Sequence, residues 1–193
     1  MIRTFLRAPT GVAEVAADLF RVLAALSIVI ASLGWGPIEA ATIAFAAGGT
    51  LLPRLVGVRP SFDIAFGVVL LVAAWSSVLQ LYVSTRWWDL PMHFLTNGLC
   101  AALGYIVFVQ LGLVADGAML PRPVVSTVVM TVAIGLSLGV IWEILEWFGH
   151  TFIDENIFVG YVDTIGDLIW GGAGALCAGY LMPYLRGRSK AVG

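Results

Sequence analysis

The chain has 193 residues, of which 60% are hydrophobic and 11% charged, and its formal net charge is −2. Its mean hydropathy of +0.98 is far above the range of water-soluble globular proteins and predicts an integral membrane protein. The chain has no basic surface suited to nucleic acid, so we expect membrane lipids and not nucleic acid as its surroundings.

Six apolar runs are each long enough to cross a bilayer, which takes about 20 residues. Prolines and glycines fall where these runs begin or end, as at Pro53, Pro60, Pro123 and Gly149. We therefore expect an all-α protein, a bundle of six transmembrane helices that forms a single domain over residues 1–193. The expected spans are residues 14–34, 38–56, 62–83, 89–114, 123–149 and 160–183.

The basic residues gather on one side when the loops are assigned alternately to the two faces of the membrane. Only Arg86 falls on the other side. Because loops rich in Lys and Arg stay in the cytoplasm, we expect both termini to be cytoplasmic and the protein to be a multi-pass component of a bacterial inner membrane. The gathered residues are Arg3, Arg7, Arg54, Arg59, Arg122, Arg186, Arg188 and Lys190.

Acidic residues concentrate at the opposite, outer ends of the last three spans. An ionised carboxylate at membrane depth costs about 2.5 to 3.5 kcal/mol, so several together require a compensating interaction. Three pairs are spaced so that both members share one face of a helix. These pairs are Asp89 with His93, Glu143 with Glu146, and Asp163 with Asp167.

If the three faces point to a common centre, they form an acidic pocket that must hold protons, an arginine or a metal ion. Arg86 can neutralise one carboxylate. Carboxylate and imidazole ligands suit a divalent cation, although ligand type alone does not identify it. We expect His93, Glu143, Asp163 and Asp167 as metal ligands, Glu146 or Asp89 as the general base, and Asn97 as an orienting group.

Most of these residues also fit ordinary structural roles. Asp89 and Asp163 fit helix N-caps, and His93 fits a hydrogen bond to a neighbouring helix. Glu143 and Glu146 are harder to explain in this way, because the dipole at a helix C-terminus disfavours anions. Four tryptophans are expected to form an aromatic belt at the membrane interface: Trp87, Trp88, Trp142 and Trp147. Gly135 and Gly139 are expected to allow close helix packing.

Three motifs occur together over roughly residues 85 to 180: D-x-x-x-H at Asp89, W-E-x-x-E-W at Trp142 and D-T-x-x-D at Asp163. In these motifs the chain resembles the YjdF-like family of small bacterial inner-membrane proteins of unknown function. The resemblance implies a compact multi-helix membrane domain with these positions as its signature, and it implies no activity.

We interpret the chain as a membrane-embedded, divalent-metal-dependent hydrolase or transferase that acts on a lipid or a lipid-linked phosphate near the extracytoplasmic side. Two alternatives stay open. The same acids fit a cation or proton transporter or channel component, which would be a homo-oligomer, because intramembrane acids also mark ion paths. They equally fit an accessory subunit of a larger membrane complex, in which they tie its own helices together.

Overall fold

The computed structural model of the chain describes residues 2–155 and 157–186, and the regular structure in this part is helical, which confirms the all-α prediction. Among the described residues, five helices are long and apolar enough to cross a membrane. They are α2 (Val12–Gly34), α5 (Pro60–Val78), α7 (Asp89–Gln110), α8 (Pro123–Phe152) and α9 (Tyr161–Leu185). A multi-pass membrane protein follows from their number and composition.

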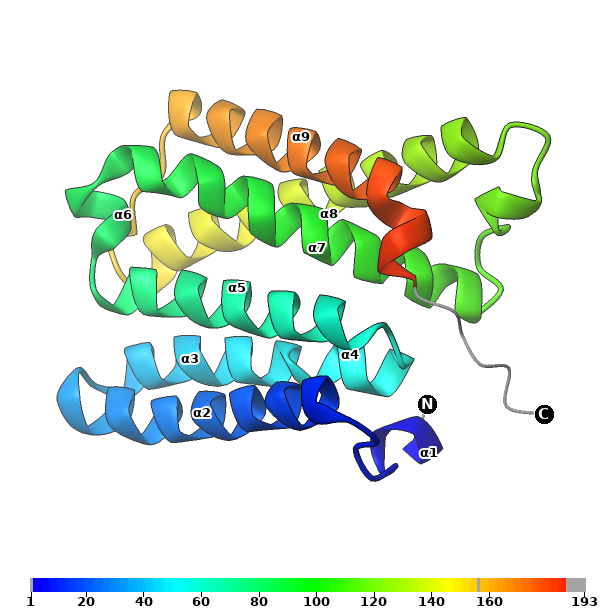
Figure 1. Cartoon of the computed structure of the whole chain (residues 1–193). Helices are drawn as coiled ribbons and strands as arrows, with labels where there is room; N and C mark the ends of the chain where they lie inside the picture. The colour runs from blue at the N-terminus through cyan, green and yellow to red at the C-terminus, as the bar shows by residue number, and fades with distance from the viewer. Residues whose placement is uncertain (1, 156, 187–193) are drawn as a thin grey trace. The chain divides into compact units, whose positions relative to one another are not determined.

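The first of two compact units covers residues 1–84 and 184–193. In this unit α2, α3 (Pro37–Gly49) and α5 pack side by side (Figure 1), with three short helices, α1 (Ile2–Phe5), α4 (Leu51–Val56) and α6 (Leu81–Ser84). Small side chains let the three long helices approach closely. A central cluster consists of Ala31, Ile43, Ala46, Ala74 and Val78.

The expected span over residues 38–56 corresponds to two helices, α3 and α4, with Thr50 between them. Pro53 has no N–H to donate to the carbonyl of Gly49, so the regular hydrogen bonding is interrupted here. The Arg21 Nε donates to the Thr50 carbonyl oxygen at 3.1 Å, where a helical N–H would normally donate. A sixth membrane crossing by α3 and α4 stays a prediction.

The expected span over residues 62–83 is also shorter in the structure. Helix α5 ends at Val78, and Gln80 adopts a left-handed backbone conformation with φ of 57° before α6 begins. A left-handed residue cannot continue a right-handed helix, so the chain turns here.

Buried charges in the first unit are paired. Arg21 is the central partner, with only 11% of its side chain exposed, and it bonds Asp63 on α5. The three arginines and three carboxylates of this network balance one another. The pairs are Arg7–Glu14 at 2.6 Å, Arg21–Asp18 at 2.8 Å, Arg21–Asp63 at 2.5 Å, and Arg54 with Glu14 and with Asp18 at 3.6 Å each.

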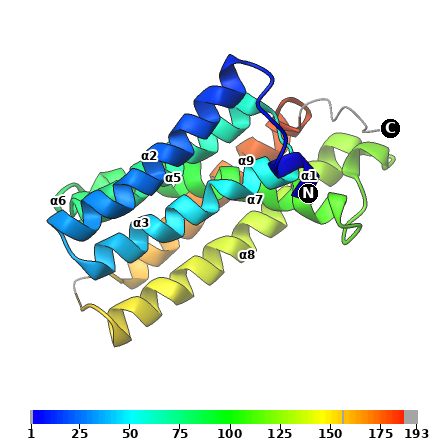
Figure 2. The same cartoon turned by 90° about the horizontal axis from the view of Figure 1, so that it is seen from below.

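The second compact unit covers residues 85–183. It contains η1 (Arg86–Trp88), α7, η2 (Gly117–Met119), α8 and α9 as far as Pro183, and Figures 1 and 2 show α8 alongside α7. The expected span over residues 89–114 ends earlier, at Gln110, because Gly112 has φ of 70° and turns the chain out of the helix.

Glycines allow α7, α8 and α9 to pack closely. A side chain at Gly174 of α9 would collide with the backbone carbonyl of Phe94 on α7, and one at Gly98 would lie 2.8 Å from the Gly174 carbonyl oxygen. On α8, a Cβ at Gly135 would collide with Ala175. The packing role predicted for Gly135 is therefore confirmed, and these contacts fix the depth at which the polar residues of the three helices meet.

The side of the membrane on which the termini lie stays a prediction, as does the assignment of residues 1–193 to a single domain. Two of the basic residues on which the orientation depends, Arg188 and Lys190, lie outside the described residues.

Candidate functional site

Helix α7 brings Asp89 and His93 together. Asp89 is the first residue of the helix and Trp88 is its N-cap, so the capping interpretation of Asp89 does not hold. One turn separates the two residues, and Asp89 Oδ1 lies 3.4 Å from His93 Nε2. The imidazole is well buried, with 13% of its side chain exposed.

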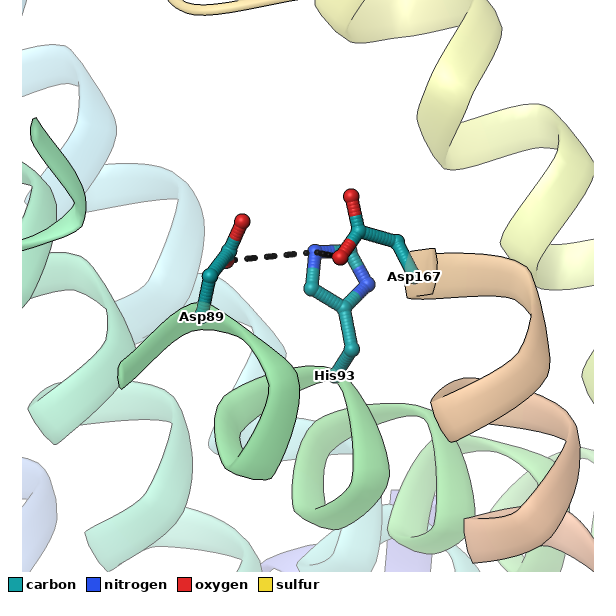
Figure 3. A group of neighbouring side chains, drawn as sticks. All are labelled: Asp89, His93 and Asp167. Carbon is teal, nitrogen blue, oxygen red and sulfur yellow. Dashed lines mark ion pairs between the residues drawn. The ribbon is translucent and has the colours of Figure 1, made fainter. Parts of the chain in front are cut away.

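Helix α9 adds Asp167 to this pair. Its Oδ1 lies 3.8 Å from the same His93 Nε2, so the carboxylates of α7 and α9 converge on one imidazole nitrogen (Figure 3). Asp167 is 2% exposed. Asp89, His93 and Asp167 each offer a ligand atom within 4.8 Å of the other two.

Helix α8 contributes Glu143 and Glu146 from the other side. Each offers a carboxylate oxygen that lies within 4.8 Å of the other and of a His93 ring nitrogen. His93 thus belongs to two groups of ligand atoms, one shared with α9 and one with α8. We call the five residues Asp89, His93, Glu143, Glu146 and Asp167 the acidic cluster.

Three oxygens of the acidic cluster are buried without a hydrogen-bond partner among the described residues. They are both carboxylate oxygens of Asp167 and Oε1 of Glu143. Buried polar atoms are almost always hydrogen-bonded, because a missing partner costs roughly 1 to 3 kcal/mol and more for a charged group. The His93 nitrogen at 3.8 Å is too distant to be that partner for Asp167.

The charges of the acidic cluster are not balanced, in contrast to the network around Arg21. Four carboxylates surround one imidazole. The guanidinium of Arg86 lies 5.2 Å from the ring centre of Phe158. Two unit charges 4 Å apart repel by about 4 kcal/mol at an effective dielectric constant of about 20. The cluster therefore needs added positive charge, as protons or as a cation.

Asp163 and Asn97 lie outside both groups of ligand atoms. Asp163 is the third residue of α9 and half-buried, and no ligand-atom group among the described residues includes it. The Asn97 amide nitrogen lies between α8 and α9, near the positions that side chains on Gly139 and Gly171 would fill. The metal-ligand role predicted for Asp163 and the orienting role predicted for Asn97 stay predictions.

His150 and the tryptophans have structural roles. His150 lies within α8, and its Nδ1 is 2.6 Å from the Ile157 carbonyl oxygen, which ties the end of α8 to the following loop. Trp87 and Trp147 are 67% and 53% exposed, as expected for a belt at the membrane interface.

The donor set fits a divalent cation. Carboxylates and one imidazole are the ligands that magnesium, manganese, iron or zinc accept, and the cluster supplies four carboxylates around His93 from three helices. The two ligand-atom groups share only His93. An ion in the first group would satisfy the buried oxygens of Asp167, and an ion in the second would satisfy the buried oxygen of Glu143.

A family model described as "Predicted membrane protein (DUF2238)" matches residues 19–188. The match includes α7, α8 and α9 and therefore every residue of the acidic cluster. It is consistent with the resemblance to a YjdF-like family that the three motifs indicate. Comparison with curated proteins gave no match, and neither did comparison with solved structures.

Proposed function

The chain belongs to the DUF2238 family of predicted membrane proteins, and we propose that it is a divalent-metal-dependent hydrolase or transferase whose substrate is a lipid or a lipid-linked phosphate. The proposal depends on one observation, the burial of the Asp167 carboxylate without a hydrogen-bond partner. This residue is 2% exposed, its two carboxylate oxygens have no hydrogen-bond partner among the described residues, and it faces His93 beside Asp89. A bound cation is the simplest partner for this oxygen pair.

The proposed metal ligands are His93, which belongs to both ligand-atom groups, with Asp167 from one group and Glu143 from the other. Both carboxylates have buried oxygens without partners, and a single ion would draw them together around His93. A divalent ion held there would supply Lewis acidity toward a phosphoryl oxygen. Asp89 or Glu146 then acts as the general base, because each lies close to His93 and can accept the proton of an attacking hydroxyl.

Arg86 is proposed to bind the phosphate of the substrate. It is exposed on η1, three residues before Asp89. A guanidinium can form two parallel hydrogen bonds to a phosphate. Arg86 and the cation would then approach the phosphate from two sides.

Elemental analysis of the purified protein tests the metal site. The wild-type protein should contain about one equivalent of a divalent metal, and Asp167→Asn and Glu143→Gln should each lose most of it. Glu155→Gln is the matched control, because Glu155 is an exposed loop carboxylate outside the acidic cluster. Metal content that is unchanged in both cluster variants, or a folded wild-type protein that takes up no added divalent metal, would contradict the proposal.

The reaction is tested with phosphatidic acid in detergent micelles as the probe substrate. Release of inorganic phosphate should require the metal, and it should fall at least 100-fold in Glu143→Gln if this residue is a ligand. Ion flux into proteoliposomes that depends on the same residues, without phosphate release, would replace the enzyme with the transporter alternative.

The proposal places the acidic cluster at the extracytoplasmic side of a bacterial inner membrane, with both termini cytoplasmic. Single cysteines introduced at Glu155 and at Arg122, in a chain whose Cys100 and Cys177 are replaced by serine, test this orientation. A membrane-impermeant maleimide added to intact cells should label position 155 and not position 122. The reverse pattern would invert the topology.

A further inference from the structure

An apolar groove of about 420 Å³ lies between α8 and α9. Its walls include Val132 and Leu136 from α8 and Ile165, Ile169, Ala173 and Leu176 from α9. Ligand pockets typically enclose about 300 to 1,000 Å³, so the groove is large enough for part of a ligand, and its lining offers hydrocarbon only.

The groove is long and follows one face of α9. Ile165, Ile169, Ala173 and Leu176 are spaced by three or four residues and therefore share that face. Eleven residues separate the first from the last, which corresponds to about 16 Å along a helix. This is about half of the roughly 30 Å hydrocarbon core of a bilayer, so the groove has the length of one leaflet.

One end of the groove approaches Glu143 of the acidic cluster. On α9, Ile165 lies at the level of Asp163 and Asp167 but on the opposite face of the helix, so the connection runs along α8. On α8, Leu136 is two turns from Glu143 and on the same face. The groove therefore leads away from the cluster toward the middle of the helices.

Gly172 lies against Leu136 midway along the groove. A Cβ at this position would lie 3.1 Å from Leu136 Cδ2, a tight contact that a small movement of the flexible leucine side chain could relieve. At Gly135 a Cβ would instead collide with Ala175, where no such movement is available.

We propose that the α8–α9 groove binds the hydrocarbon tail of the same lipid whose phosphate is bound at the acidic cluster. This inference rests on the proposed function and narrows its substrate to a lipid with at least one tail about one leaflet long. A hydrocarbon tail matches the apolar lining, the length and the continuity with the cluster. A transmembrane helix matches less well, because such helices approach through small residues, whereas the walls here are mainly Leu, Ile and Val.

A photoreactive phosphatidic acid with a diazirine in its acyl chain tests the groove in purified protein. Illumination should concentrate the label on the groove residues of α8 and α9, as mapped by peptide mass spectrometry. Ala173→Phe fills the groove and should lower this labelling at least five-fold. Ala133→Phe is the matched control, since Ala133 is exposed on α8 outside the groove, and its labelling should equal that of the wild-type protein.

A second filling variant and a second lipid probe complete the test of the groove. Leu176→Trp, at a residue 44% exposed, should also lower labelling at least five-fold, and it replaces Ala173→Phe if that variant does not fold. The diacylglycerol probe, which lacks the phosphate, should label the groove at least five-fold less than the phosphatidic acid probe. Even labelling of all lipid-exposed helices, labelling unchanged by both filling variants, or equal labelling by the two probes would overturn the inference.

Metal analysis of the same samples separates this inference from the proposed function. Selective labelling that Ala173→Phe removes, in a protein that contains no metal, would retain the groove as a lipid-tail site and reject the metal enzyme. Stoichiometric metal together with labelling that shows no preference for the groove would retain the metal site and reject the tail site.

Discussion

Replacing Asp167 with asparagine should change protein stability in opposite directions with and without metal. The substitution keeps the shape of the side chain and removes its charge. Asp89 and Asp167 offer carboxylate oxygens that lie within 4.8 Å of each other. At that distance two ionised carboxylates repel by about 3 kcal/mol at an effective dielectric constant of about 20. In the metal-free protein, Asp167→Asn should therefore stabilise the fold, by up to about 3 kcal/mol where both groups are ionised.

With metal bound, the sign should reverse. A ligand present at 1,000 times its dissociation constant stabilises the folded state by about 4 kcal/mol, and the variant loses most of this contribution because Asp167 is a ligand. Thermal unfolding in detergent, with a chelator and with added Mn²⁺ or Zn²⁺, measures both effects. The melting temperature of Asp167→Asn should exceed that of the wild-type protein in chelator and fall below it in metal.

Glu155→Gln should show neither effect, since Glu155 is an exposed loop residue. A shift of the melting temperature by Asp167→Asn that has the same direction and size in chelator and in metal would refute a metal-ligand role for Asp167. This role is also refuted if no divalent metal raises the melting temperature of the wild-type protein.

Three other substitutions test the packing and the polar contacts. Arg21→Met leaves Asp63 buried without its partner at 2.5 Å and should lower the free energy of unfolding, measured by chemical denaturation, by about 3 to 5 kcal/mol. The double variant Arg21→Met/Asp63→Leu should recover most of this loss. A double variant that is no more stable than Arg21→Met would contradict this expectation. Gly174→Val collides with the backbone of α7 and should cost more than about 4 kcal/mol, so a normal yield of folded protein in size-exclusion chromatography would refute the close crossing. Tyr105→Phe removes the acceptor of the buried Gly117 N–H, at 2.8 Å, and should cost about 1 to 3 kcal/mol in thermal unfolding, with an unchanged melting temperature as the contrary result.

Helix positions could be predicted from the sequence because span length and apolar content are set by the bilayer itself. The breaks within the expected spans could not be located as accurately as the helices themselves. Pro53 marks the break in the expected 38–56 span, but the hydrogen bond from Arg21 to the Thr50 carbonyl beside it is a tertiary contact that the sequence does not show. The turn at Gln80 has no glycine or proline to mark it, since a glutamine takes the left-handed conformation there.

The convergence of Asp89, His93, Glu143, Glu146 and Asp167 was predictable from helical spacing, because residues three or four apart share a face. The sequence does not show which helix faces point inward, because this depends on the glycine contacts among α7, α8 and α9. Asp163 illustrates the limit. Its spacing to Asp167 equals that of Asp89 to His93, yet it sits one turn nearer the helix end and outside the ligand-atom groups.

The charge network that joins Glu14, Asp18 and Asp63 to the arginines of the first unit was not predicted from the sequence. Arg21 in the middle of an apolar run was the signal that could have found it, because a charged residue inside a membrane span usually has a buried partner. The α8–α9 groove left no comparable signal, since its Leu, Ile and Val residues resemble any lipid-facing surface.

Electron paramagnetic resonance of Mn²⁺ added to the metal-free protein tests the metal site, because it reports which atoms surround the ion. We expect a single tightly bound Mn²⁺ whose pulsed spectra show coupling to one imidazole nitrogen. His93→Gln should abolish this coupling, and His150→Gln should preserve it. Mn²⁺ that stays free in solution, or a nitrogen coupling that survives His93→Gln, would rule out a metal site at His93.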